Sequence, residues 1–202
     1  MSILDSIGSR ISGLFAKPTS PPASSSRPDP LQAIQSRQNA EVSPPDYKQL
    51  MSDALTKEGI NNPNTNAYAL GTIQHETNGT NQPIDELGGN DYFTNMYEGR
   101  QDLGNTQPGD GALYHGRGYI QLTGRANYRD TGKRIGVDLE NNPELAKDPT
   151  VAAKVMAAYF KDRGVADEVK SNGFTPYARR LVNGGDNGLD NVNQYANQYL
   201  NQ

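Results

Sequence analysis

The chain has 202 residues, of which 34% are hydrophobic, a net charge of −4 and no cysteine. This length and composition fit one globular domain with an extension, and the lack of cysteine excludes disulfides as a source of stability. The first 46 residues carry equal numbers of basic and acidic side chains, so the remainder is acidic, with 15 basic and 19 acidic residues. Such a balance argues against nucleic acid as a partner, which would require a basic face.

The first predicted element is a short amphipathic helix over residues 2–16, with Ser2 placed to cap its start. No apolar run approaches the ~20 residues that span a bilayer, and this segment lacks the continuous apolar stretch of a secretory signal. The apolar positions recur at helical spacing and are Leu4, Ile7, Ile11, Leu14 and Phe15.

A linker rich in proline and serine follows this helix and continues to residue 46. Its composition cannot pack a core, and an isolated helix of four turns is marginal in water. We therefore expect residues 1–46 to form an anchor whose helix, residues 2–16, docks on a protein partner. Two alternatives stay open, namely binding to a membrane surface and a frayed leader whose periodicity is incidental.

From Tyr47 onward the pattern predicts a globular domain over residues 47–202. Its most regular helix runs over residues 149–163 and is expected to be the spine of the core, with a buried stripe of Ala152, Val155, Met156, Tyr159 and Phe160. Capping residues followed by proline, and glycines at expected ends, support two of the boundaries. The further predicted helices cover residues 47–58, 65–77, 176–183 and 189–200, and the capping signals are Asp148-Pro149, Thr175-Pro176, Gly164 and Gly184.

Residues 78–147 are expected to be rich in loops, with a small sheet near residues 119–122. The predicted fold class is therefore α+β, mostly helical, with a small β element. Within this region, residues 105–128 form a run of glycine, aromatic and polar residues that no core-building strand or helix needs. Glycine lets the backbone approach a ligand closely, and tyrosines offer flat faces and hydroxyls, so the run is typical of a site that binds sugars.

Four segments resemble glycoside hydrolase family 19, the family of chitinases and phage lysozymes. They are His-Glu-Thr at 75–77, Tyr-Glu-Gly-Arg at 97–100, Gly-Arg-Gly-Tyr-Ile-Gln-Leu-Thr-Gly-Arg-Ala-Asn-Tyr at 116–128, and Asn-Gly-Gly at 183–185. Their order and spacing fit the family over roughly residues 47–202, and the chain looks most similar to short, cysteine-free bacteriophage lysins. The resemblance implies a lysozyme-like fold and a reaction without a cofactor.

Hydrolysis of a glycosidic bond ordinarily uses two carboxyl groups, one as acid and one as base. The resemblance makes Glu76 the general acid and places Glu98 at the general base, with Glu86 the next candidate if Glu98 does not act. It implies an inverting mechanism, in which Thr123 matches the hydroxyl residue that helps to hold the attacking water. Substrate contacts are expected from Tyr114, Tyr119, Gln121, Asn127 and Asn183.

Three arginines, Arg100, Arg117 and Arg125, could each pair with a catalytic or a structural carboxylate, and at least one structural salt bridge is expected. Neighbours in a helix do not face one another, so we expect no dyad between His75 and Glu76. A zinc site of the His-Glu-x-x-His type is excluded because position 79 is glycine, and no metal site is expected.

The predicted function is cleavage of the β-1,4-glycosidic bond of the peptidoglycan glycan strand, between N-acetylmuramic acid and N-acetylglucosamine. The extension over residues 1–46 favours a lysin carried in the tail or interior of a phage virion that acts in the bacterial periplasm or cell wall. The alternatives are an endolysin made in the host cytoplasm, a chitinase, and a virion structural component with an inactive lysozyme-like domain.

Overall fold

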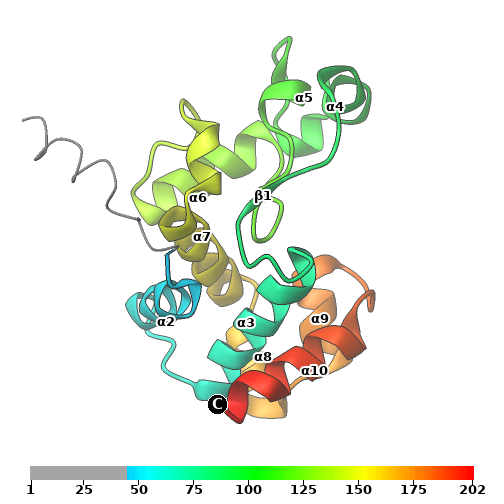
Figure 1. Ribbon diagram of the computed structural model, residues 1–202. Helices are drawn as coiled ribbons and strands as arrows, with labels where there is room; N and C mark the ends of the chain where they lie inside the picture. Colours follow the sequence, from blue (N-terminus) through cyan, green and yellow to red (C-terminus); the bar gives the residue numbers. More distant parts are fainter. Residues whose placement is uncertain (1–44) are drawn as a thin grey trace, which may run out of the picture. The chain divides into compact units, whose positions relative to one another are not determined.

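The structure is a computed structural model that describes residues 45–202 (Figure 1). The predicted anchor over residues 1–46, its helix at 2–16 included, falls outside the described residues except for its last two. The elements are α2 (Tyr47–Lys57), α3 (Pro63–Glu76), β1 (Ile84–Asp85), α4 (Asn90–Tyr97), η1 (Gln101–Leu103, 3-10), α5 (Asp110–Leu113), β2 (Arg117–Gly118), α6 (Arg125–Ile135), η2 (Pro143–Lys147, 3-10), α7 (Pro149–Asp162), α8 (Val165–Asn172), α9 (Pro176–Asn183) and α10 (Leu189–Leu200). Within the described residues, no helix is long and apolar enough to cross a membrane.

The larger core cluster surrounds α3, which packs along α10 in the lower part of Figure 1. The two helices are in close contact because α3 has a glycine at their crossing. A Cβ atom on Gly71 would lie 2.7 Å from the backbone nitrogen of Ala196 and 2.7 Å from the carbonyl oxygen of Val192. The cluster's large buried side chains include Met51, Leu55, Tyr68, Ile73, Met156, Phe160 and Val192.

Helix α7 is the spine that the sequence predicted, because its side chains enter both core clusters. Met156 and Phe160 belong to the larger cluster, whereas Val155 belongs to a smaller cluster under α6. Tyr159 is half-buried, and its hydroxyl donates to the carbonyl oxygen of Val182 at 2.8 Å. The smaller cluster consists of Tyr114, Leu122, Tyr128, Leu139, Ala146 and Val155.

The predicted helix boundaries are confirmed to within two residues, and α9 and α10 have the predicted bounds. Asp148 accepts hydrogen bonds from the amides of Thr150 and Val151, and Thr175 accepts one from Ala178, as capping residues do. In each case proline occupies the first turn, where its missing N–H costs no hydrogen bond. Gly184 ends α9 in the left-handed region, with φ of 80°.

The region of residues 78–147 is more helical than the sequence predicted, because α4, α5 and α6 lie within it. Helix α6 buries only Tyr128 and Gly132 of its eleven residues, so few apolar residues mark it in the sequence. The small sheet pairs Ile84 with Gly118 and Asp85 with Arg117, so β2 directly precedes the predicted residues 119–122. Residues 119–121 form a turn with Gln121 at a positive φ of 53°, and Leu122 forms an isolated bridge with Arg117.

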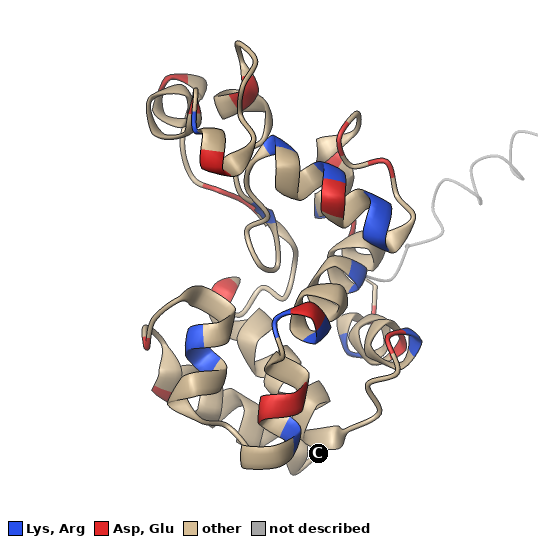
Figure 2. Cartoon of the chain, turned by 180° about the vertical axis from the view of Figure 1, so that it is seen from behind, with Lys and Arg blue, Asp and Glu red and all other residues tan. Residues whose placement is uncertain are grey.

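Basic and acidic residues are interspersed over the helices and loops of the described domain (Figure 2). Several are paired, such as Arg134 with Glu58 at 2.6 Å and Arg180 with Asp186 at 2.7 Å.

Candidate active site

Glu76 is the last residue of α3, at the end of the helix that faces β1 in Figure 1. Its side chain is 30% exposed, and its Oε1 accepts a hydrogen bond from Nη2 of Arg179 at 2.8 Å. Arg179 is 1% exposed, and its Nε donates to the carbonyl oxygen of Asn187 at 2.7 Å. The carboxylate of Glu76 is thus held by a buried arginine of α9, which the sequence did not single out.

His75 has a different environment from its neighbour Glu76. A Cβ atom on Gly188 would overlap the His75 ring, so the imidazole lies directly against the backbone that precedes α10. His75 therefore packs on the loop that also accepts the hydrogen bond from Arg179, and it forms no dyad with Glu76. Across residues 45–202, no group of three or more histidine, cysteine or acidic side chains could hold a metal ion.

Glu86 follows β1 directly and is held through both carboxylate oxygens. Its Oε1 accepts a hydrogen bond from the hydroxyl of Tyr97 at 2.7 Å, and its Oε2 accepts one from the amide of Gly116 at 3.0 Å. Burial, together with the hydrogen bond to Glu86, raises the pKa of Tyr97 to about 12, so this hydroxyl stays a donor at neutral pH. Glu86 also donates its own amide to the carbonyl oxygen of Gly116 at 2.8 Å.

Three side-chain oxygens converge over Gly116. A Cβ atom there would lie 2.8 Å from Oε1 of Gln121, 3.1 Å from Oε2 of Glu86 and 3.3 Å from Oγ1 of Thr123. The amide nitrogen of Gln121 is bound to the carbonyl oxygens of Ile84 and Gly118, which turns its oxygen toward this point. A carboxylate, an amide oxygen and a hydroxyl in one place can bind a water molecule and accept its proton.

Glu98, the predicted base, lies in a different setting, because its carboxylate is bound to backbone amides. Oε1 accepts from the amide of Gly109 at 2.6 Å and Oε2 from the amide of Gly111 at 2.8 Å. A Cβ atom on Gly111 would lie 2.6 Å from the backbone nitrogen of Glu98, so the two segments are in close contact. These contacts favour a structural role in which Glu98 fixes the loop before α5.

Two of the predicted substrate contacts are contradicted by burial. Tyr114 and Tyr119 are each only 2% exposed, so neither ring offers a face to a sugar. Their hydroxyls donate to the carbonyl oxygens of Glu140 and Asn81, at 2.9 and 3.3 Å, and both rings belong to the core clusters. In the sequence, tyrosines within a glycine-rich segment indicated a sugar-binding site. In the structure, these two tyrosine rings pack into the core beneath that segment.

Of the other three predicted contacts, Gln121 lies over Gly116 as described above, and Asn127 and Asn183 are exposed. The amide of Asn127 donates to the carbonyl oxygen of Thr123 at 2.6 Å, and that of Asn183 donates to the carbonyl oxygen of Asn187 at 3.2 Å. Each therefore lies next to a residue of the candidate site, Asn127 beside Thr123 and Asn183 beside the loop that holds Arg179. Their contact with substrate stays a prediction.

The three arginines singled out in the sequence all pair with carboxylates other than Glu76, Glu86 and Glu98. Arg100 binds Asp102 at 2.6 Å, and Arg117 binds Asp85 and Glu144 at 3.2 and 2.8 Å. Arg125 binds Asp110, which is 1% exposed and also accepts hydrogen bonds from the amides of Thr106 and Gln107. The hydrogen bond from Arg125 lowers the pKa of Asp110 below its usual value despite burial, so this pair fixes the loop as an ion pair.

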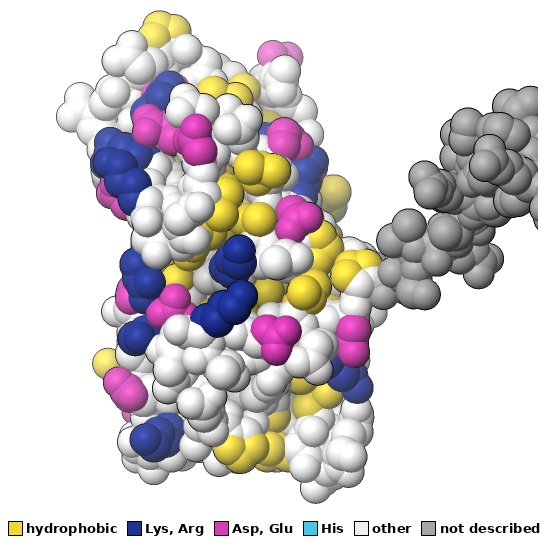
Figure 3. Space-filling model, turned by 90° about the vertical axis from the view of Figure 1, so that its left-hand side faces the viewer, with side chains coloured by type: hydrophobic (Ala, Val, Ile, Leu, Met, Phe, Trp, Pro, Cys, Tyr) yellow, Lys and Arg dark blue, Asp and Glu magenta, His cyan; other side chains and the backbone are white. Residues whose placement is uncertain are grey.

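A cavity of about 360 Å³ lies between α6 and α7, on the face where hydrophobic side chains are exposed beside basic ones (Figure 3). None of the predicted site residues lines it. Its walls are Ile120, Asp130, Thr131, Arg134, Val155, Ala158, Tyr159, Asp162 and Arg163.

Residues 54–165, more than half of the chain, match the family model described as chitinase class I, glycoside hydrolase family 19. A glycosyl hydrolase family 19 domain-containing protein of Haemophilus influenzae is 36% identical over 95 residues, which cover 47% of this chain and 45% of that protein. An acidic endochitinase of Petunia hybrida is 45% identical over 96 residues, which cover 46% of this chain and 34% of that protein.

The fold is similar to the crystal structure of chitinase C from Streptomyces griseus, with a TM-score of 0.60 and 25% identity over 76% of this chain and 84% of that one. This similarity confirms the expected α+β, mostly helical, lysozyme-like fold. The match spans less than half the length of the curated relatives named above.

Proposed function

Because the chain belongs to glycoside hydrolase family 19, we propose that it hydrolyses the β-1,4-glycosidic bonds of an amino-sugar glycan, with Glu76 as general acid and Glu86 as general base. The observation that carries this assignment is the convergence of the Glu86, Gln121 and Thr123 oxygens over Gly116. Glu98 is bound instead to the backbone of residues 109–111.

In the proposed reaction, Glu76 donates a proton to the oxygen of the leaving sugar while Glu86 takes a proton from a water molecule. The water attacks the anomeric carbon from the face opposite the leaving group, the carbon–oxygen bond to that group breaks, and the configuration inverts. Such a mechanism requires the two carboxyl groups to lie roughly 6.5–9.5 Å apart in the substrate complex. Arg179 orients Glu76, and Tyr97 and Gly116 orient Glu86.

We propose the glycan strand of peptidoglycan as the substrate. The support is the resemblance of the chain to short, cysteine-free lysins, since it contains no cysteine and plant-type chitinases carry disulfides. Chitin is the second candidate, since the similar proteins include an acidic endochitinase. Both polymers are β-1,4-linked, so the same pair of carboxyl groups would serve either one, and the choice lies in the contacts with the sugar substituents.

The test compares Glu76→Gln, Glu86→Gln and Glu98→Gln on purified murein and on chitin oligomers. A variant that lacks an acid or a base is expected to lose roughly 100-fold or more in turnover, as Glu76→Gln and Glu86→Gln should. Early proton NMR spectra should show the α-anomer as the first product. Wild-type turnover by Glu86→Gln, or a β-anomer as the first product, would contradict the assignment. Faster hydrolysis of chitin than of murein would show that chitin, and not peptidoglycan, is the preferred substrate.

A further inference from the structure

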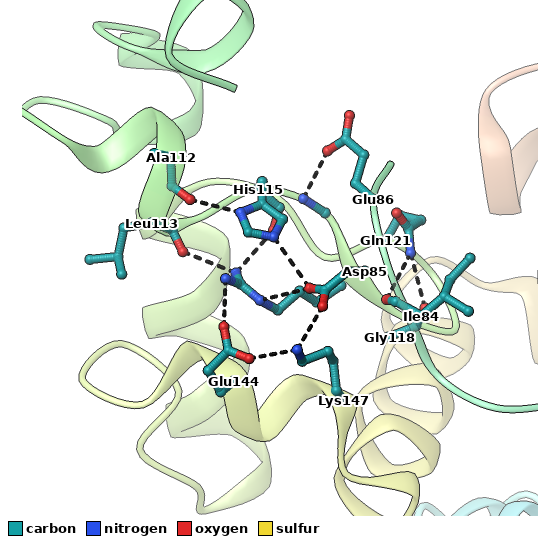
Figure 4. Close-up of polar contacts among 12 residues, drawn as sticks. Ile84, Asp85, Glu86, Ala112, Leu113, His115, Gly118, Gln121, Glu144 and Lys147 are labelled. Atoms are coloured by element: carbon teal, nitrogen blue, oxygen red, sulfur yellow. Dashed lines mark hydrogen bonds and ion pairs between the residues drawn. The ribbon is translucent and has the colours of Figure 1, made fainter. Parts of the chain in front are cut away.

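Asp85 and Glu86 are adjacent in the chain but point to different sides of β1 (Figure 4). Asp85 faces a cluster of cationic groups, where it accepts hydrogen bonds from Nζ of Lys147 at 2.6 Å and Nε2 of His115 at 3.3 Å, and lies 3.2 Å from Nε of Arg117. Burial acts to raise the pKa of Asp85, but the hydrogen bonds from Lys147 and His115 outweigh it, so the pKa is lowered. The side chain of Asp85 is therefore an ionised anchor for the strand that precedes Glu86.

His115 is the partner of Asp85 that connects this strand to α4 and α5. Its side chain is 12% exposed, with Nδ1 at 2.7 Å from the carbonyl oxygen of Ala112 and Nε2 at 3.3 Å from Oδ1 of Asp85. Both partners are hydrogen-bond acceptors. The ring also stacks on Phe93 of α4, with centroids 4.2 Å apart and planes inclined by 6°.

The other two partners of Asp85 are joined to η2, although Arg117 also donates to the carbonyl oxygen of Leu113 in α5 at 2.9 Å. Lys147 is the last residue of η2 and binds Glu144 of the same element at 2.6 Å, and Arg117 donates to Glu144 at 2.8 Å. Arg117 further donates to the hydroxyl of Tyr128 at 3.1 Å. His115 alone among the described partners of Asp85 contacts α4, the helix whose last residue, Tyr97, binds the Glu86 carboxylate.

We propose that His115 is a positioning residue for Glu86: its contact with Asp85 joins the residue before Glu86 to the residue before Gly116, whose amide binds the Glu86 carboxylate. The segment that carries Glu86 and the segment that carries its partner Gly116 are thereby fixed relative to each other. This inference rests on the proposed role of Glu86 as the base. A displacement of about 1 Å in a catalytic group can cost roughly 100-fold in rate, so a contact outside the reacting atoms can control turnover.

Two substitutions by amide side chains distinguish a positioning role of His115 from a role in packing alone. In His115→Asn the amide nitrogen takes the place of Nδ1, so the contact with Ala112 is kept and that with Asp85 is lost. In His115→Gln the amide nitrogen takes the place of Nε2, so the contact with Asp85 is kept and that with Ala112 is lost. Both variants lose the ring stacked on Phe93, which makes each the control for the other.

We expect His115→Asn to lower kcat about 10- to 100-fold with KM within about threefold of wild type, and His115→Gln to lower kcat several-fold less. Asp85→Asn should lower kcat at least as much as His115→Asn, because it also weakens the contacts with Lys147 and Arg117. Adding His115→Asn to Asp85→Asn should cost little more than Asp85→Asn alone, because the contact with His115 is already weakened there. Equal kcat values for His115→Asn and His115→Gln would overturn the inference. The inference would also be overturned if the loss of kcat in the double variant, expressed as free energy, equalled the sum of the two single losses.

A readout independent of activity uses the amide of Gly116, whose proton is donated to Glu86. Its NMR chemical shift should move in His115→Asn toward the value in Glu86→Gln and should stay near the wild-type value in His115→Gln. An unmoved shift in His115→Asn would contradict the positioning role. If Glu86→Gln retains turnover, the proposed function fails and the inference with it, whereas an inactive Glu86→Gln with equal His115 variants refutes the inference alone.

Discussion

Replacing Glu98 by glutamine should weaken the fold and spare the chemistry. In the native structure each carboxylate oxygen accepts one backbone amide, from Gly109 at 2.6 Å and from Gly111 at 2.8 Å. Glutamine keeps one acceptor oxygen, but its amide nitrogen would face the second backbone N–H, donor against donor. Gly111 is buried, so an unpaired amide there is costly.

The expected cost follows from this one lost bond. Hydrogen bonds to charged groups contribute about 1.5–3 kcal/mol, and the lower part of that range applies because Glu98 is half-exposed. A loss of about 1.5–2 kcal/mol corresponds to a fall in Tm of roughly 3–8 °C for a domain of this size. Turnover on murein, measured well below the Tm, should stay within about threefold of wild type because no reacting atom is changed.

Two measurements on the same preparation test this prediction. One is thermal unfolding, monitored by circular dichroism, and the other is turnover. Glu86→Gln serves as the parallel control, since it should lose turnover under the same conditions. If Glu98→Gln has the wild-type Tm and loses 100-fold or more in turnover, Glu98 acts on the substrate and the structural interpretation is refuted.

Two further substitutions test the packing and the acid stability of the fold. Gly71→Ala should lower the free energy of unfolding in urea by about 1–3 kcal/mol, because the new Cβ atom would meet the backbone of α10 at 2.7 Å. Alanine has the better helix propensity, so an increase in stability would contradict this packing. Asp110 has a pKa lowered from 3.8, chiefly by its hydrogen bond to Arg125, so its stabilisation is present above pH 3.8 and is lost as the pH falls through the lower folded value. Asp110→Asn should therefore be less stable than wild type at pH 6 and show a flatter loss of stability below pH 4, and parallel pH–stability curves for the two proteins would argue against this ion pair.

Features that depend on neighbouring residues in the chain could be predicted from the sequence. Asp148-Pro149 and Thr175-Pro176 start helices because a capping side chain and proline act on the adjacent turn, and Gly184 ends one because glycine adopts positive φ at little cost. The buried stripe of α7 was likewise predictable, since a period of 3.6 residues is a local property of the chain. The helical pattern before His-Glu-Thr also predicted that Glu76 lies near the end of a helix, and Glu76 is the last residue of α3.

The choice between two carboxylates depended on contacts between residues distant in the chain. Glu86 and Glu98 both lie in the stretch predicted to be rich in loops, but the amide of Gly116 lies beside one and the amides of Gly109 and Gly111 beside the other. Such contacts form only when β1 pairs with β2 and α4 packs on α5, so no local pattern reveals them. The same holds for the burial of Tyr114 and Tyr119 under their segment and for Arg179, which reaches Glu76 across 103 positions of the chain.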